Sequence, residues 1–400
     1  MKKTILVLLV ALTVVLSRES LHAQFDPTQG CIVGPDGQCL PNTIITAVPF
    51  LRIVPDARSG GMGDAGIAIS PDANAMHFNP SKLAFAEEDL GLSATYTPWL
   101  RALGLTDVYL AYLTGYKQLN SEETIGFGLR YFSLGDINFT NVNGQPEGTG
   151  RPREFEIALS YSRQLGEKLS AGISGKYIYS NLASGQQIGT TQIEAANAGA
   201  ADISLTYKTD MEVSGKDTDL TIGFVVSNIG TKVSYTKSVD KDYIPANIGI
   251  GAAWDYHLDD FNTITFALDV NKLLVPTPCA ENCDEDGNNR PDYKDLGVAS
   301  SILSSFGDAP GGFSEELQEL MYSVGVEYWY DKQFAVRAGY YAEHKLKGNR
   351  KFFTVGLGLK YNIFGLNLSY LVPTTNQRNP LDNTLRFSLL FDFAAFAADE

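Results

Sequence analysis

The chain has 400 residues, a formal net charge of −15 at pH 7, and only 19% charged residues. This acidic balance argues against a nucleic-acid-binding protein and against a basic membrane-surface protein. The 38 glycines and 11% aromatic residues are unusual for a water-soluble chain of this length, and they favour a β protein whose outer face is not in water.

The N-terminus is typical of a secretory signal peptide covering residues 1–23. Lys2 and Lys3 precede an apolar run over 5–16, and a small-residue cleavage site makes Gln24 the first mature residue. The run is too short to span a membrane stably, and no later run reaches 18 apolar residues. We therefore expect export through the Sec pathway and no transmembrane helix.

Residues 59–85 contain a literal G-x-G-x-x-G, formed by Gly61, Gly63 and Gly66. Such a motif binds dinucleotide phosphates only between a strand and a helix of a βαβ unit. Prolines on both sides leave no room for that strand and a ten-residue crossover helix. The glycines are therefore expected to allow tight turns and close backbone approach.

From about residue 89 onward, apolar and small or polar residues alternate along short segments. In 123–133, for example, Ile125 and Phe127 share one face, and Gly126 and Arg130 share the other. Segments of about ten such residues with aromatic ends are typical of an outer-membrane barrel. We predict fourteen strands, at 89–97, 107–117, 123–133, 153–163, 168–180, 199–208, 218–228, 246–256, 261–272, 321–330, 333–342, 351–361, 364–372 and 383–393.

The connections support this count because they alternate in length. Those after even-numbered strands are short, whereas those after odd-numbered strands are mostly longer, the longest covering 273–320. Short periplasmic turns and long external loops are typical of outer-membrane barrels, in which closure also removes every unpaired edge. The sequence thus predicts an all-β fold, a closed antiparallel barrel over 89–393.

Charged residues fall on the glycine-bearing face of the strands, and this face must therefore line the lumen. A charge facing lipid near the midplane would cost about 2–4 kcal/mol. A paired, solvated lumen is favoured over a selective ion pathway. The predicted lumen charges are Arg130, Lys176, Arg337, Lys360, Arg386, Glu156, Asp202, Asp269 and Glu327.

The long loop over 273–320 contains two local signals. "GGFSEELQELM" predicts a short helix with Ser314 as its N-cap, acidic residues at its positive end, and Phe313 packed against it. Its role is to cover the barrel mouth or to contact a partner. Candidate partner- or cargo-binding residues are Phe306, Pro310, Gly311, Gly312, Phe313 and Leu317.

The same loop resembles the start of a calcium site. Asn282, Asp284 and Asp286 follow the N-x-D-x-D spacing and Gly287 supplies the turn, but Tyr293 replaces the bidentate glutamate. A solvated acidic loop tip is the favoured alternative.

Four cysteines form two local pairs, Cys31 with Cys39 and Cys279 with Cys283. Two short-loop disulfides are possible after export. A metal site at the second pair would have no nearby histidine to complete it.

The sequence offers no constellation for catalysis and predicts no cofactor. There is no G-x-S-x-G, and the mature histidines, His77, His257 and His344, belong to distant segments. We therefore do not expect an enzyme.

Residues 61–85, "GMGDAGIAISPDANAMHFNPSKLAF", resemble the N-terminal hatch of FadL-type fourteen-stranded barrels. Ser81 stands where that hatch usually has alanine. The resemblance implies that residues 24–88 form a plug in the lumen. The residues implied to shape it are Gly61, Gly63, Asp64, Gly66, Asp72, Asn79 and Pro80.

More specifically, the segments 50–68, 273–278 and 306–330 resemble the PorV family of the type IX secretion system, and the likeness runs from about 44 to 393. It implies an outer-membrane barrel that is not a free pore. Implied partners are the translocon barrel, the C-terminal signal domains of secreted proteins, the sortase-like attachment complex and outer-membrane lipid. A FadL-like transporter of hydrophobic small molecules is the alternative. The C-terminal tail, 394–400, has no assigned role.

Overall fold

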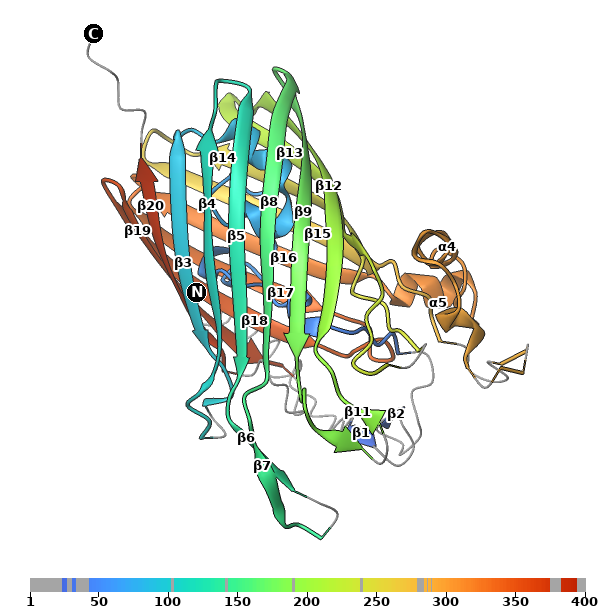
Figure 1. The fold of residues 1–400 in the computed structure, drawn as a ribbon. Coiled ribbons are helices and arrows are strands. Elements are labelled where there is room, and N and C mark those ends of the chain that lie inside the picture. The colour runs from blue at the N-terminus through green and yellow to red at the C-terminus, as the bar shows by residue number, and fades with distance from the viewer. Residues whose placement is uncertain are drawn as a thin grey trace, which may run out of the picture.

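The structure is a computed structural model, which describes residues 24–26, 31–33, 43–101, 104–140, 143–188, 191–237, 240–278, 284–285, 287–288, 290–374 and 383–393. The predicted signal peptide, 1–23, and the tail, 394–400, lie outside these residues. Fourteen strands form one closed barrel in which all neighbours are antiparallel (Figure 1), as predicted. They are β3 (Leu90–Pro98), β4 (Val108–Gln118), β5 (Glu123–Leu134), β8 (Arg153–Gly166), β9 (Leu169–Asn181), β12 (Ala196–Val213), β13 (Lys216–Gly230), β14 (Asn247–His257), β15 (Asn262–Leu273), β16 (Met321–Tyr330), β17 (Phe334–Ala342), β18 (Lys351–Tyr361), β19 (Phe364–Pro373) and β20 (Leu385–Phe393).

The hairpin of β12 and β13 is the main departure from the predicted strand ends. The predicted strand ends leave residues 209–217 as a nine-residue turn. In the structure this stretch is paired backbone except for Ser214 and Gly215, which form the turn. Both have positive φ, 56° and 74°, which is the conformation that a tight two-residue hairpin turn requires. Because most side chains at 209–217 are polar, the sequence pattern indicated a loop here. The hydrogen bonds between two paired strands, however, depend only on backbone groups.

The two faces of the wall are assigned as predicted. Phe127 and Leu357 are 39% and 46% exposed on the outer face, whereas Arg130 on the inner face is buried. Lys360 lies near the end of β18, where its side chain is 38% exposed and pairs with Asp392. The lumen charges that are buried are Arg130, Arg337, Arg386, Glu156, Asp202, Asp269 and Glu327.

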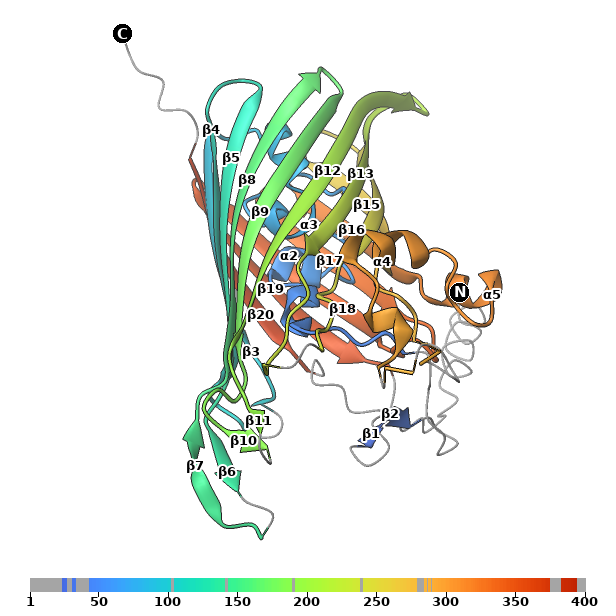
Figure 2. The same ribbon diagram turned by 45° about the vertical axis from the view of Figure 1, so that its right-hand side comes forward.

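These buried charges correct one expectation, because the lumen is packed rather than solvated. Residues 43–88, which we call the hatch, run through the barrel interior, and Figure 2 shows its helices α2 (Ala57–Gly60) and α3 (Ala75–Phe78) inside the wall. Two 3₁₀ helices complete it, η1 (Pro49–Arg52) and η2 (Pro80–Phe85), and each begins with a proline.

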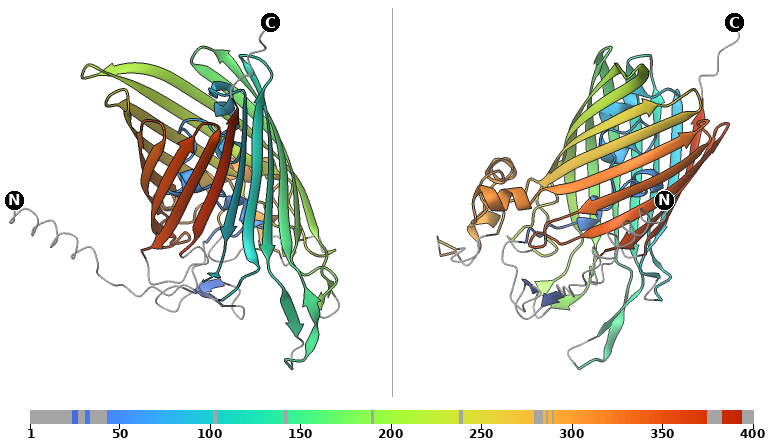
Figure 3. Two further views of the ribbon diagram at one scale, coloured as in Figure 1. Left: turned by 90° about the vertical axis from the view of Figure 1, so that its left-hand side faces the viewer. Right: turned by 180° about the vertical axis from the view of Figure 1, so that it is seen from behind.

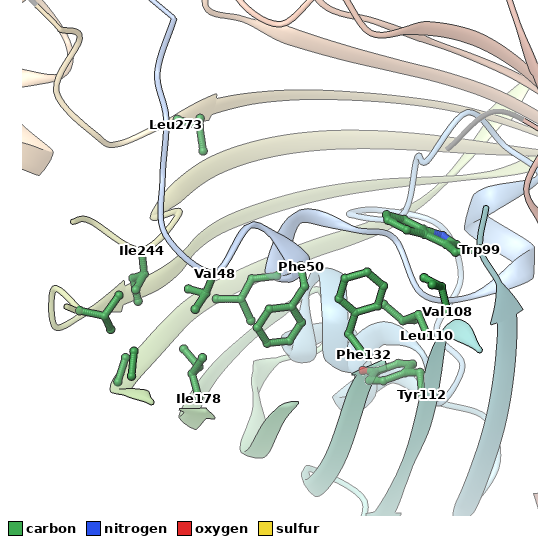
Figure 4. Packing of buried hydrophobic residues seen from close by; sticks show 14 of the residues in the cluster. Val48, Phe50, Trp99, Val108, Leu110, Tyr112, Phe132, Ile178, Ile244 and Leu273 are labelled. Carbon is green, nitrogen blue, oxygen red and sulfur yellow. The ribbon is translucent and has the colours of Figure 1, made fainter. Parts of the chain in front are cut away.

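The hatch begins at the end of the barrel where the long connections leave. There Val48 and Phe50 join a buried apolar cluster with Ile244, Leu273 and side chains from eight further strands (Figure 4). The hatch ends at the short-turn end, where Gln118 and Gln164 donate side-chain hydrogen bonds to hatch carbonyl oxygens at 2.6 Å. It thus occupies the lumen along its length.

Several small elements lie beyond the wall at the long-connection end. Two-stranded sheets are formed by β1 (Gln24–Asp26) with β2 (Cys31–Val33), β6 (Ile137–Thr140) with β7 (Pro146–Gly150), and β10 (Gln187–Ile188) with β11 (Thr191–Gln192). Helices η4 (Asp292–Lys294), α4 (Val298–Ser304) and α5 (Phe313–Gln318) belong to the longest connection and lie beside the barrel (Figures 1 and 3). No helix in the described ranges is long and apolar enough to cross a membrane.

Candidate functional site: the hatch and a lateral arm

Glycines of the wall form a flat seat for the glycine motif of the hatch. An ideal Cβ on Gly325 of β16 would lie 2.6 Å from Met62, and one on Gly356 of β18 would lie 3.1 Å from the Cα of Gly61. Gly339 of β17 packs directly on Gly63, whose φ is 68°. Real Cβ atoms do not approach so closely, so the two backbones meet only because side chains are missing from both.

The third glycine of the motif lies against the adjoining part of the wall, formed by β13, β14 and β15. The backbone N–H groups of Gly66 and Ile67 donate to Oδ2 of Asp269 at 2.7 and 2.9 Å. The Ile67 side chain fits over Gly223 and Gly251 of β13 and β14. The motif therefore contacts the wall with both backbone and side chains, in a setting with no βαβ unit and no nucleotide loop.

Asn79 and its neighbours fix the last turn of the hatch. Asn79 Nδ2 donates to the Ile67 carbonyl oxygen and to Oγ1 of Thr206, both at 3.0 Å. The Ser81 hydroxyl lies 2.6 Å from Oδ1 of Asn79 and 2.7 Å from Thr206 Oγ1. Serine at this position thus contributes contacts to the wall that alanine would lack. Pro80 starts η2, and its carbonyl oxygen accepts from Ser162.

A buried ion triad joins the hatch to β16 and β17. Arg58 donates to both carboxylate oxygens of Glu327 at 3.0 and 2.7 Å, and Arg337 donates to the same carboxylate. Arg58 is also 3.5 Å from Oδ2 of Asp72, whose Oδ1 accepts from the backbone of Asn74. Because all three members of the triad are buried, removing Glu327 would leave two arginines without the carboxylate that they share.

Asp64 and Arg130 make two further hatch–wall contacts. Asp64, with φ 64°, pairs with Arg386 at 3.6 Å. Arg130 donates to the carbonyl oxygens of Phe50 and Leu51 at 3.2 and 2.9 Å. Every hatch residue singled out from the sequence therefore lies in the lumen and takes part in a hydrogen bond, an ion pair or a close contact with the wall.

Some sequence-predicted sites fall outside the described residues. These are Cys39, Cys279, Cys283, Asn282 and Asp286. Of the residues predicted to act with them, the backbone of Cys31 and the residues Asp284 and Gly287 are described. Within the described residues, no group of three or more His, Cys, Asp or Glu side chains could hold a metal ion. The two disulfides and the calcium loop remain predictions.

The described part of the longest connection, residues 290–320, forms what we call the lateral arm. Lys272 of β15 shares the outward face with Leu268, yet it is buried, because α5 covers it. Its Nζ is 2.9 Å from Glu316 and pairs with Glu319 as well. Lys347, from the β17–β18 connection, lies 2.7 Å from Glu315. Salt bridges thus hold α5 on the outer flank of the wall.

Local details of α5 differ from the sequence expectation. The helix begins at Phe313 with Gly312 as N-cap, at φ 66°, rather than with Ser314. The preceding turn is fixed by Gly311, whose N–H donates to the Glu315 side chain at 2.6 Å. Phe313 does not pack against the helix, since it is 76% exposed. The acidic first turn was predicted correctly, but its carboxylates face the lysines of the barrel.

A second brace connects the arm to the 231–245 connection. The Tyr243 hydroxyl lies 2.9 and 2.7 Å from the carbonyl oxygens of Tyr293 and Leu296, and its single proton is shared between these two acceptors. Lys232 lies 4.1 Å above the Tyr243 ring and donates to the carbonyl oxygen of Lys294. Helix α4 was not predicted, because its Ser-rich sequence has neither a capping residue nor a long apolar period.

The arm presents apolar side chains away from the barrel. Leu303 and Phe313 are each about three-quarters exposed, and Phe306 and Leu317 are about half exposed. With α5 fixed by three carboxylates and α4 by Tyr243, these side chains are held on a braced support. Pro310 and Gly311 shape the turn between them. An ordered exposed apolar surface of this kind is typical of an interaction site.

A closed antiparallel barrel of fourteen strands with an N-terminal hatch in its lumen (Figure 2) defines an outer-membrane β-barrel protein. The family model described as type IX secretion system protein PorV matches residues 37–280, more than half of the chain. The chain therefore belongs to the PorV family.

Three solved structures are similar to the chain at low identity. The toluene transporter TbuX of Ralstonia pickettii is 12% identical, with a TM-score of 0.49, over 84% of this chain and 98% of that one. A FadL homologue of Pseudomonas aeruginosa is 11% identical, with a TM-score of 0.41, over 88% and 100%. The toluene transporter TodX of Pseudomonas putida is 10% identical, with a TM-score of 0.46, over 85% and 98%. No curated protein sequence matches the chain.

Proposed function

We propose that this barrel binds the C-terminal signal domain of proteins exported by the type IX system. In this role it carries them from the translocon barrel to the surface attachment complex with its sortase-like protease. The observation that carries the proposal is the braced lateral arm, which presents Leu303, Phe306, Phe313 and Leu317 beside the wall. Membership of the PorV family supports the same secretion system.

The packed lumen supports a role that does not pass cargo through the barrel. Apolar contacts fill its outer end around Phe50, and side-chain hydrogen bonds tie its inner end to Gln118 and Gln164. A polypeptide would have to displace buried charges as well as backbone contacts. Binding on the outside is the physically easier route.

The position of the arm supports a partner that is itself embedded in the membrane. Because α5 covers an outward-facing lysine of β15, the arm lies on the same flank as the lipid-facing side chains of β15 and β16. A partner barrel standing beside this flank could contact the arm and the wall together. The translocon barrel is the partner of this kind in our proposal.

The test is the double substitution Phe313→Ser/Leu317→Ser, compared with Leu346→Ser in the β17–β18 connection. Leu346 is 42% exposed but lies off the arm, so it is a matched control. We expect the double variant to assemble, yet to leave secreted proteins uncleaved in the cell or on the translocon. Deletion of 307–320 should act in the same way. Normal surface delivery by both variants would contradict arm docking.

A second function, transport of hydrophobic small molecules, is favoured by one observation. A cavity lies between hatch and wall and has apolar side chains such as Phe78 and Val225 in its lining. If this is the function, the double arm variant should secrete normally, and a variant that fills the cavity should fail to take up a hydrophobic nutrient.

A further inference from the structure

The hairpin of β12 and β13 projects beyond its neighbours at the short-turn end of the barrel (Figure 2). The adjoining strand β9 begins at Leu169, which pairs with Tyr207 of β12, whereas β12 continues to Val213. Residues 209–213 are therefore paired with β13 on one side, and no described strand pairs with them on the other. The short-turn end faces the periplasm in outer-membrane barrels.

The backbone groups of Asp210 and Glu212 point to this open edge. Lys208, two residues earlier, donates its backbone N–H to the carbonyl oxygen of Lys168 at 2.8 Å, on the β9 side. Because the backbone groups of an antiparallel strand point to alternate sides, those of positions 210 and 212 point to the same side as those of Lys208. A row of N–H and C=O groups of this kind is a template for a further strand.

One face of the projecting hairpin places like charges directly opposite each other. Asp210 lies opposite Asp219, and Glu212 lies opposite Asp217. Asp219 has Lys208 at 3.9 Å, but the other three carboxylates form no ion pair with any described residue. Like charges in direct opposition destabilise a pair of strands, so this face of the hairpin favours a neighbour that supplies positive charge.

The other face of the hairpin is apolar and continues the lipid-facing side of β12. Met211 and Val213 are 38% and 36% exposed, and alternation along the strand places them on the side opposite to Asp210. A strand added at the open edge would alternate in register with β12, because its pleat continues that of the sheet. Basic side chains of the added strand would then lie beside the carboxylates, and apolar ones beside Met211 and Val213.

Charge distinguishes among the possible occupants of the edge. A second copy of this chain would bring the carboxylates of its own Asp210 and Glu212 to a face that already carries like charges in opposition. Anionic lipid headgroups would be repelled in the same way. A basic polypeptide in extended conformation supplies both the positive charge and the backbone hydrogen-bonding groups that the edge lacks.

We propose that the projecting edge of β12 binds a strand of a periplasmic polypeptide in which basic and apolar residues alternate. The strand adds to the sheet along residues 208–213, and its lysine or arginine side chains pair with Asp210 and Glu212. The lateral arm belongs to a connection at the other end of the barrel, so this contact is independent of the arm docking proposed above.

Two synthetic peptides of identical composition test the edge directly. One alternates lysine and valine along its length, and the other has all its lysines in one block and all its valines in a second. Each is added to the purified full-length barrel in detergent, and hydrogen exchange of the backbone is measured. At saturation the alternating peptide should slow exchange at Asp210 and Glu212 by about tenfold, and the block peptide should not.

Single substitutions separate strand pairing from charge attraction. Glu212→Pro removes an N–H group from the open edge, where proline leaves the hydrogen bonds between β12 and β13 intact, and it should abolish the protection of Asp210. Asp260→Asn removes an exposed carboxylate from the β14–β15 turn and should leave the protection unchanged. Equal protection by the two peptides, or protection that survives Glu212→Pro, would show attraction without strand pairing and would overturn the proposal.

Photo-cross-linking in cells identifies the natural occupant. p-Azidophenylalanine replaces either Met211 at the edge or Tyr361, which is 74% exposed at the short-turn end of β18. After irradiation, the probe at position 211 should form an adduct with a polypeptide segment in which basic and apolar residues alternate, and the probe at position 361 should not form it. The same adduct at both positions, lipid adducts alone, no adduct at 211, or a segment without this alternation would overturn the proposal.

Discussion

Gly339 of β17 and Gly63 of the hatch pack backbone to backbone, and neither position has room for a Cβ atom. Gly63 also has a left-handed φ of 68°, which disfavours any other residue. The contact explains how a segment without long helices can be held in a lumen. The wall and the hatch fit each other because side chains are absent from both surfaces.

The first prediction concerns this contact. Gly339→Ala inserts a methyl group into backbone of the hatch, and overpacking of this kind destabilises a folded protein by about 1–3 kcal/mol. The hatch should then be cleaved by added protease at a higher rate. Gly175→Ala is the control, because its Cβ would meet nothing within 4 Å. Equal protease resistance in the two variants would show that the glycine seat does not hold the hatch.

The fourteen strands could be predicted from the sequence because a wall between lipid and lumen imposes strict alternation. The hairpin that extends β12 and β13 could not be predicted, because polar residues in paired strands have the same sequence pattern as a loop. The hatch glycines were recognised by their resemblance to FadL-type proteins, but their partners on β16, β17 and β18 were not. Contacts such as Gly61 with Gly356 join residues almost 300 positions apart.

The second prediction concerns the buried triad. Glu327→Gln removes the negative charge that Arg58 and Arg337 share, and loss of one member of a buried ion pair costs about 3–5 kcal/mol. The midpoint of denaturant unfolding in detergent should fall. Glu122→Gln, at an exposed ion pair, should leave the midpoint almost unchanged. A similar midpoint for both variants would argue that the triad is not structurally important.

The third prediction concerns pH at the surface end. Burial alone would raise the pKa of Glu343, which lies outside the strands, but Arg350 and Arg52 lower it to about 2 from its ordinary value of 4.5. A lowered carboxyl pKa adds stability that is present above pH 4.5 and is lost as the pH falls toward 2. Thermal unfolding followed from pH 7 to pH 2 should show this loss. Glu343→Gln should be less stable at pH 7 and should lack this part of the pH dependence.

The fourth prediction concerns the lipid face. Leu357→Arg places a charge against lipid, at a cost of about 2–4 kcal/mol near the midplane, and should reduce the fraction that is heat-modifiable in a detergent gel. Leu357→Met should assemble normally. The neighbouring Gly358 is unsuitable as a control, since a Cβ there would contact the Arg337 guanidinium. Full assembly of Leu357→Arg would mean that this position is not exposed to lipid.

The lateral arm shows the limit of sequence reasoning about the site. The acidic start of α5 and the apolar Phe306, Phe313 and Leu317 were all identified from the sequence. That Lys272 and Lys347 pair with the carboxylates, and so turn the apolar side chains outward, depends on the tertiary arrangement of separate connections. No local pattern predicts on which flank of the barrel the arm lies.

The central claim is that the hatch stays in the lumen during secretion, and that the partners and the cargo bind to the outside of the barrel. The hydroxyl groups of Ser81 in the hatch and Thr206 in β12 are 2.7 Å apart, so Ser81→Cys/Thr206→Cys is positioned to form a disulfide. The most direct measurement is surface delivery of secreted proteins by cells whose only copy of the barrel carries this cross-link, with and without reductant. Our account predicts full delivery by the oxidised, locked barrel. Delivery that stops in the oxidised barrel and returns on reduction would contradict it.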